Sequence, residues 1–171
     1  MIFNEMIREV KLEDAKQIAE IYNYYILNTI VTFEETSVSM EEMKDRIITV
    51  ISKFPWLVYE SDGEIKGYAY GSEWKSRCAY KYSLESSVYL KHDETGRGIG
   101  SRLYEELLKQ LKTLDFHAVI GGISLPNEKS ISLHEKFGFK KIAQFHEVGY
   151  KFEKWIDVGY WELILGKSFR P

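Results

Sequence analysis

The amino-acid sequence predicts an α+β fold, a single domain in which a mixed sheet is flanked by helices. Segments that alternate like strands and segments with helical periodicity succeed one another along the whole chain. Its 171 residues are enough for one ordinary domain with a sizeable core. We find no repeat, low-complexity tract or linker, so residues 1–171 are expected to form one domain.

The first part of the chain predicts a strand followed by two helices. Met6 to Val10 alternates apolar and polar side chains, and Asp14 to Asn28 carries apolar residues at helical spacing. Ser39 and Glu42 form a capping box, in which each side chain reaches a free backbone amide, so a second helix begins there. Phe54-Pro55 ends that helix.

The middle of the chain predicts three strands and a third helix. Trp56 to Glu60 and Glu64 to Trp74 are strand-like, and Ser61-Asp62-Gly63 has the turn chemistry of an antiparallel hairpin. A fourth strand runs from Tyr82 to Leu90. After a glycine-rich turn comes an amphipathic helix with Leu103, Leu107, Leu108 and Leu111 on its buried side.

The last part predicts a fifth strand, a fourth helix and two closing strands. Ala118 to Ile123 is strand-like, and Asn127 is a favourable N-cap for a helix that reaches Phe137. Gly138 lies where a helix C-terminus favours a left-handed residue. The closing strands are expected at about 140–150 and 158–165.

Composition and charge exclude several functional classes. The net charge is −3 and no Lys/Arg block occurs, so nucleic acid is not an expected partner. No apolar run approaches the roughly 20 residues of a membrane span, and Glu5, Arg8 and Glu9 do not suit a signal peptide, so we expect a cytoplasmic protein without a membrane partner. Cys78 is the only cysteine, which excludes an internal disulfide, and we expect it to be a semi-buried apolar residue. No metal is expected, because the histidines lack the spacing of a metal site.

The turn at Gly96-Arg97-Gly98-Ile99-Gly100 is the most informative segment. Glycine lets a backbone approach a ligand closely, and the free amides and dipole at a helix N-terminus favour phosphate. The spacing fits neither a Walker loop nor the dinucleotide fingerprint. The residues alone leave two alternatives, a site for a diphosphate-bearing cofactor and a plain connection between strand and helix.

Several blocks in order carry a resemblance to a known family: residues 54–58 (FPWLV), 74–77 (WKSR), 85–89 (ESSVY), 125–127 (LPN), 133–135 (LHE) and 155–161 (WIDVGYW). With the glycine turn, the chain resembles the GNAT N-acetyltransferase superfamily and, within it, the phosphinothricin N-acetyltransferase family. The resemblance covers nearly the whole chain. It implies a mostly antiparallel seven-stranded sheet with about four helices, acetyl-CoA as co-substrate, no metal, and a homodimer.

The turn departs from the superfamily at its first position. The usual pattern begins with Gln or Arg, whereas Thr95 stands here and has no long side chain to lay over a cofactor. Arg97 is a candidate replacement for that contact. Most phosphate contacts in such a turn come from backbone amides, so the departure concerns affinity more than function.

Glu85 and His134 are the candidate catalytic residues. Glu85 lies in an apolar strand, where burial should raise its pKa toward a value useful for removing a proton from an amine. His134 shares a helix face with Ile131 and Phe137, so its imidazole should face the sheet. From the residues alone both are more simply structural, and the resemblance favours catalysis, with acid or base work left open for His134.

The resemblance also implies residues that bind the two substrates. Those expected to bind acetyl-CoA are Val88, Tyr89, Leu90, Gly96, Arg97, Gly98, Ile99, Gly100, Ser101, Asn127 and Ser130. Those expected to bind an anionic amino acid are Lys75, Arg77 and Tyr80, with Phe33 as an apolar wall.

The expected function is acetylation of the α-amine of a small amino acid analogue, phosphinothricin-like or methionine sulfoximine-like. No acyl-enzyme nucleophile is visible, so direct transfer in a ternary complex is favoured. Two alternatives stay open: a catalytically weak acyl-CoA-binding module, and a protein acetyltransferase, which would need an open acidic groove for a peptide.

Overall fold

The fold is built on one seven-stranded sheet, seen in a computed structural model that describes residues 5–166. The strand order is β1-β2-β3-β4-β5-β7-β6, and every neighbouring pair is antiparallel except β4 and β5. The strands are β1 (Glu5–Glu9), β2 (Trp56–Ser61), β3 (Glu64–Glu73), β4 (Ser83–Leu90), β5 (Ala118–Ser124), β6 (Lys140–Lys151) and β7 (Lys154–Ile164). The predicted mixed, mostly antiparallel sheet is confirmed.

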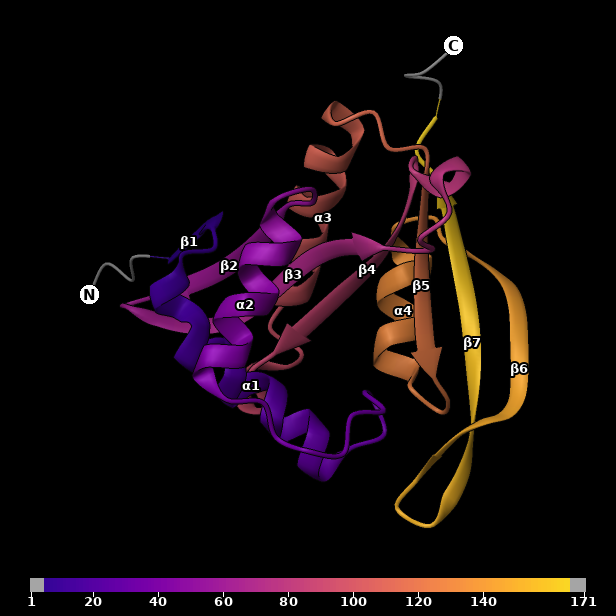
Figure 1. Ribbon diagram of the computed structural model, residues 1–171, viewed down its shortest axis with the longest axis horizontal. Helices are drawn as coiled ribbons and strands as arrows, with labels where there is room; N and C mark the ends of the chain where they lie inside the picture. Colours follow the sequence, from indigo (N-terminus) through magenta and orange to yellow (C-terminus); the bar gives the residue numbers. More distant parts are fainter. Residues whose placement is uncertain (1–4, 167–171) are drawn as a thin grey trace.

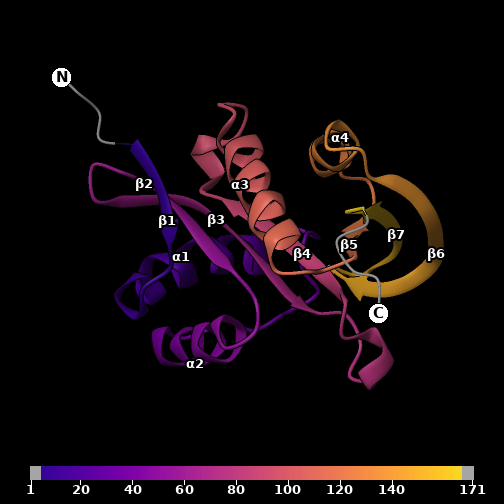
Figure 2. The ribbon, with the colours of Figure 1, turned by 90° about the horizontal axis from the view of Figure 1, so that it is seen from above.

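Helices cover both faces of the sheet (Figures 1 and 2). The helix pair α1 (Ala15–Asn28) and α2 (Met40–Ile51) lies on one face, and α3 (Ile99–Thr113) and α4 (Glu128–Lys136) lie on the other. One apolar cluster fills each side: Ile18, Ile26 and Ile47 belong to the first, and Leu103 and Leu107 to the second. The sheet is therefore buried on both faces, and its central strands are fixed firmly.

The parallel pair β4 and β5 diverges soon after it forms (Figure 1). Pairing runs from Ser83↔Ala118 to Glu85↔Ile120 and then stops. The Lys91 N–H bonds to the Lys66 carbonyl of β3, so by strand alternation the amides of Val88 and Leu90 point toward β5. Within residues 5–166 no strand pairs with that edge of β4 beyond Glu85. The divergence therefore leaves backbone donors directed at the space between two central strands.

The capping residues and turns of the structure show which of the predicted helix and strand boundaries are correct. Ser39 Oγ accepts from the Glu42 amide at 3.2 Å, and Asn127 Oδ1 accepts from the Ser130 amide at 3.2 Å, so both predicted helix starts are confirmed. The last strand was predicted from Val158 but begins at Lys154. Its turn uses Phe152 and Glu153 at φ of 52° and 60°, without the glycine that usually marks such a turn.

Cys78 is exposed, not semi-buried, because it lies in a short 3-10 turn (Cys78–Tyr80) on the loop between β3 and β4. No helix within residues 5–166 has the length and apolar character needed to cross a membrane.

Candidate active site

The glycine turn leads into α3 with two residues in the left-handed region. Gly96 has φ of 83° and Gly98, the N-cap of α3, has φ of 81°. A Cβ on either would meet no atom within 4 Å, so backbone conformation rather than packing requires glycine there. Ile99, Gly100 and Ser101 follow in the first turn of α3, where amides lack intrahelical partners. The turn has the backbone of an anion site.

Two cations from α4, neither of which the sequence pattern indicated, reach this turn. Lys129 Nζ donates to Thr95 Oγ1 at 3.2 Å, and Lys136 Nζ donates to Ser101 Oγ at 3.0 Å. Arg97, the expected replacement, is instead paired with Glu94 at 2.9 Å. The position where Thr95 lacks a long side chain is therefore supplied with a positive charge from a different helix.

Glu85 lies on the α1/α2 face of the sheet, where Tyr89 of the same strand also packs. Its carboxylate accepts a hydrogen bond from the Gly122 backbone amide. Burial raises the pKa of Glu85, and the nearby Lys75 charge and this hydrogen bond only partly oppose the shift. A carboxylate with a raised pKa is better matched to proton removal near neutral pH than an exposed one.

His134 lies on the opposite face, buried at 4 % exposure between Tyr104 and Phe139, whose ring centroids are 5.2 and 5.1 Å away. Its Nδ1 is 2.7 Å from the Ser130 carbonyl. A carbonyl can only accept, so Nδ1 carries the proton and Nε2 presents a lone pair. Burial lowers the pKa of His134, which favours the neutral imidazole, and Nε2 has no hydrogen-bond partner among residues 5–166.

The two candidate catalytic groups approach β5 from its two sides, over adjacent glycines. A Cβ on Gly121 would overlap the His134 ring, with Cδ2 only 2.6 Å away. A Cβ on Gly122 would stand 2.9 Å from Glu85 Oε1. Adjacent strand residues face opposite sides, so the sheet itself separates Glu85 from His134. The sequence analysis did not single out either glycine.

The other residues expected to bind acetyl-CoA are of two kinds. Some lie on the open edge of β4, and the others hold neighbouring groups in place. Val88 and Leu90 contribute the open edge of β4, although the Leu90 carbonyl accepts from Tyr25 Oη at 2.6 Å. The Tyr89 side chain belongs to the aromatic core and stacks on Tyr68 at 5.4 Å. Asn127 caps α4, and the Ser130 carbonyl holds His134. These last two therefore position other groups in the structure.

The residues expected to bind the acceptor differ in how the structure places them relative to Glu85. The Lys75 charge acts on Glu85, while its Nζ lies 4.7 Å from the Trp74 ring centroid. Arg77 and Tyr80 lie on the exposed loop after β3, at the 3-10 turn. Phe33 packs against β6, where a Cβ on Gly149 would lie 2.6 Å from its Cε1. Of these four residues, only Lys75 has an electrostatic effect on Glu85.

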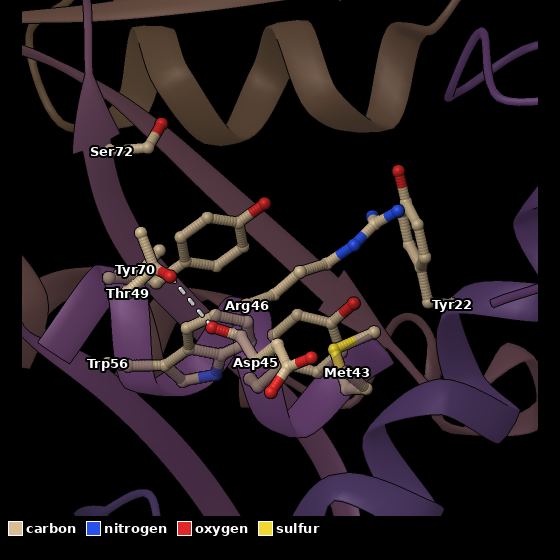
Figure 3. A pocket seen from close by; sticks show the side chains of 10 residues that line it. Tyr22, Met43, Asp45, Arg46, Thr49, Trp56, Tyr70 and Ser72 are labelled. Atoms are coloured by element: carbon tan, nitrogen blue, oxygen red, sulfur yellow. Dashed lines mark hydrogen bonds between the residues drawn. The ribbon is translucent and has the colours of Figure 1, made fainter. Parts of the chain in front are cut away.

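A pocket of about 370 Å³ lies between α2 and the sheet, on the same face as Glu85 (Figure 3). Its lining includes Tyr22, Met43, Arg46, Trp56, Tyr70 and Ser72. Ser72, at one end of this lining, is registered opposite Glu85 on the neighbouring strand β4, although Glu85 itself does not line the pocket. Arg46 is held by Glu34 through contacts of 2.7 and 2.9 Å, and Figure 3 shows its guanidinium extended toward Tyr22. This part of the face can accommodate a small organic molecule.

Metal ligation has no visible basis in this region. Among residues 5–166 no three His, Cys, Asp or Glu side chains are grouped as a metal ion requires.

Comparison with known proteins identifies the family to which this chain is similar. Residues 7–159 match the acetyltransferase (GNAT) domain family. The phosphinothricin N-acetyltransferase of Streptomyces viridochromogenes is 36% identical over 91% of this chain and 85% of its own. The L-methionine sulfoximine/L-methionine sulfone acetyltransferase of Salmonella typhimurium is 31% identical over 96% of this chain and 97% of its own.

A solved structure agrees with these sequence relatives. The GNAT superfamily phosphinothricin acetyltransferase of Sinorhizobium meliloti, in complex with acetyl-CoA, superposes with a TM-score of 0.93. It is 33% identical and covers 98% of this chain and 92% of its own. The predicted resemblance is confirmed: the chain belongs to the GNAT acetyltransferases, an acyltransferase class of enzymes, and within them to the phosphinothricin N-acetyltransferase family.

Proposed function

We propose that this enzyme acetylates the α-amine of a small anionic amino acid analogue, phosphinothricin-like or methionine sulfoximine/sulfone-like, by direct transfer from acetyl-CoA in a ternary complex. The observation that carries the proposal is the placement of Glu85 and His134 on the two sides of β5, where β4 diverges from it. The activities named for the relatives support the acceptor class.

The residues present fit acetyl-CoA. Gly96 and Gly98, both in the left-handed region, lead into the N-terminus of α3, and Lys129 and Lys136 lie beside it. Free backbone amides together with positive charge are the groups that bind a diphosphate. The open amides of β4 suit an extended, amide-bearing chain, because they are directed donors in an otherwise paired sheet. The unpartnered Nε2 of His134 lies against Gly121 of β5, the strand from which β4 diverges. Acetyl-CoA, when bound, supplies an activated acetyl thioester.

Proton handling follows from the two environments. An ammonium has no lone pair for attack, so the amine must lose a proton, and Glu85 is the carboxylate whose burial suits it to accept one. The neutral His134 fixes its proton at Nδ1 on the Ser130 carbonyl, so Nε2 can only accept. This supports a base or acceptor role for His134 before any role as an acid.

Acceptor binding is proposed on the Glu85 face. Lys75 lies near Glu85 and would attract the anionic group, and Arg77 and Tyr80 on the same loop would add to it. Phe33 would form an apolar wall from the loop after α1. That loop is held against β6 because the buried Lys151 donates to the Thr32 carbonyl at 2.7 Å.

A second copy of this chain is proposed as partner, and the cytoplasm as location. The edge hairpin β6–β7 exposes Val148, Tyr150, Phe152 and Trp155, each at 50% or more. A surface of this kind on an edge strand suits an interface between copies. Light scattering should give a dimer for the wild type and a monomer for Trp155→Glu. A monomeric wild type would refute the dimer.

A thiol-release assay with a panel of amines tests the function directly. The panel contains phosphinothricin, methionine sulfone and free amino acids, and a thermal shift with acetyl-CoA is measured beside it. We expect stabilisation by acetyl-CoA and turnover with the first two acceptors. Stabilisation without turnover on any amine would instead indicate an acyl-CoA-binding module. Turnover only with peptides would indicate a protein acetyltransferase.

A further inference from the structure

Two adjacent glycines stand at the exact point where β4 leaves β5. The last paired position is Glu85↔Ile120, and the next two residues of β5 are Gly121 and Gly122. Neither has a positive φ, in contrast to Gly96 and Gly98, so backbone conformation does not require glycine there. Glycine within a strand weakens it and often marks a close approach by another group. The presence of Gly121 and Gly122 must therefore serve a purpose other than backbone conformation.

The space left by Gly121 is filled by His134. A Cβ there would overlap the imidazole, with Cδ2 at 2.6 Å. The ring cannot retreat easily, because Tyr104 and Phe139 pack edge-on against it and Nδ1 is tied to the Ser130 carbonyl. On the same face the neighbours Val119 and Ile123 are fully buried. At Gly121 the imidazole of His134 therefore contacts the backbone of β5.

The space left by Gly122 is filled by Glu85 from the other side. A Cβ would stand 2.9 Å from Glu85 Oε1 and 3.3 Å from Tyr160 Cε1. The Gly122 amide also donates to the carboxylate. Gly122 therefore gives Glu85 both room and a hydrogen bond, and a methyl group would push the carboxylate off that donor.

We propose that Gly121 and Gly122 are positioning residues for the acetyl transfer, because their missing side chains let His134 and Glu85 meet the β5 backbone from opposite faces. The proposal deepens the proposed function and rests on it. The alternative, that both glycines serve only the fold, makes a different prediction: their replacement would cost stability regardless of which side chain faces them.

Two double-mutant cycles separate these cases. One uses Gly121→Ala, His134→Ala and the double variant, and the other uses Gly122→Ala, Glu85→Ala and the double variant. We expect Gly121→Ala and Gly122→Ala each to lower kcat about tenfold or more. Each should cost nothing further in kcat or melting temperature once its facing side chain is alanine. If Gly121→Ala alone does not fold, the double variant must fold, since the overlap is gone.

Titration of the free enzyme gives readouts that do not depend on turnover. By NMR, the pKa of His134 should rise toward its ordinary value of about 6.5 in Gly121→Ala, because the methyl group can be accommodated only if the imidazole leaves its buried site, and burial is what lowers its pKa. Gly71→Ala is the matched control: it is a strand glycine whose Cβ would have its nearest neighbours, in Leu84 and Phe54, at 3.3 Å or more. It should change neither the pKa of His134 nor kcat.

Additive losses in the two cycles, or a His134 pKa unmoved by Gly121→Ala, would overturn the proposal. A wild-type enzyme inactive on every amine would instead refute the proposed function. The stability cycle and the NMR titration would still decide whether the glycines position the two side chains.

Discussion

Lys129 Nζ lies 3.2 Å from Thr95 Oγ1, so a cation from α4 stands at the first position of the glycine turn. Lys136, further along α4, makes a similar contact with Ser101 in the first turn of α3. The family pattern places Gln or Arg where Thr95 stands. In this chain the charge comes from a helix that is distant in sequence and adjacent in space.

Lys129→Ala and Lys136→Ala should each weaken acetyl-CoA binding by roughly three- to tenfold, because each would remove the charge-assisted contact to phosphate that the proposed binding mode gives it. The loss should shrink at high salt, since exposed charges are screened. Calorimetry at two salt concentrations measures both effects. Lys112→Ala, at the far end of α3, is the control and should bind normally. Equal affinities for all three variants would contradict a phosphate role for α4.

Gly98→Val should weaken acetyl-CoA binding severely, because valine is strained at φ of 81° and would deform the turn. Gly63→Val is a matched control, since Gly63 has φ of 80° and equally open surroundings in the β2–β3 hairpin. Both variants should lose similar thermal stability. Only Gly98→Val should lose affinity, and a normal dissociation constant for it would exclude the turn from binding.

Glu85→Gln should lower kcat about tenfold or more with little change in acetyl-CoA affinity, because the amide cannot accept the amine proton. Burial raises the pKa of Glu85, so the wild-type rate should fall as pH drops through a value above the ordinary one of 4.5. That acidic limb of the kcat/KM profile should be absent in the variant. A variant with unchanged turnover removes Glu85 from the mechanism.

His134 should make folding sensitive to mild acid. Burial lowers its pKa in the folded state, so the unfolded chain binds the proton more tightly. Its stabilising effect is complete above the unfolded value of about 6.5 and is lost as pH falls below it, with a slope of at most about 1.4 kcal/mol per pH unit. Urea unfolding between pH 7 and 5 should show a flatter profile for His134→Asn. Identical profiles would mean that His134 titrates normally.

Sequence patterns anticipated features that are local, and missed those that depend on tertiary approach. The caps at Ser39 and Asn127 are confirmed because a cap is made within a few residues. Lys129 resembles any solvated helix lysine until α4 is placed beside Thr95. Gly121 and Gly122 resemble weak points in a strand until His134 and Glu85 occupy their spaces. In each miss the decisive partner comes from another element.

The central claim is tested most directly by a crystal structure of this enzyme with coenzyme A bound. The account predicts the phosphates against residues 96–101 with Lys129 beside them. It also predicts the sulfur between the diverging strands, with His134 Nε2 on one side and Glu85 on the other. A nucleotide bound away from that turn, or a sulfur distant from both side chains, would contradict it.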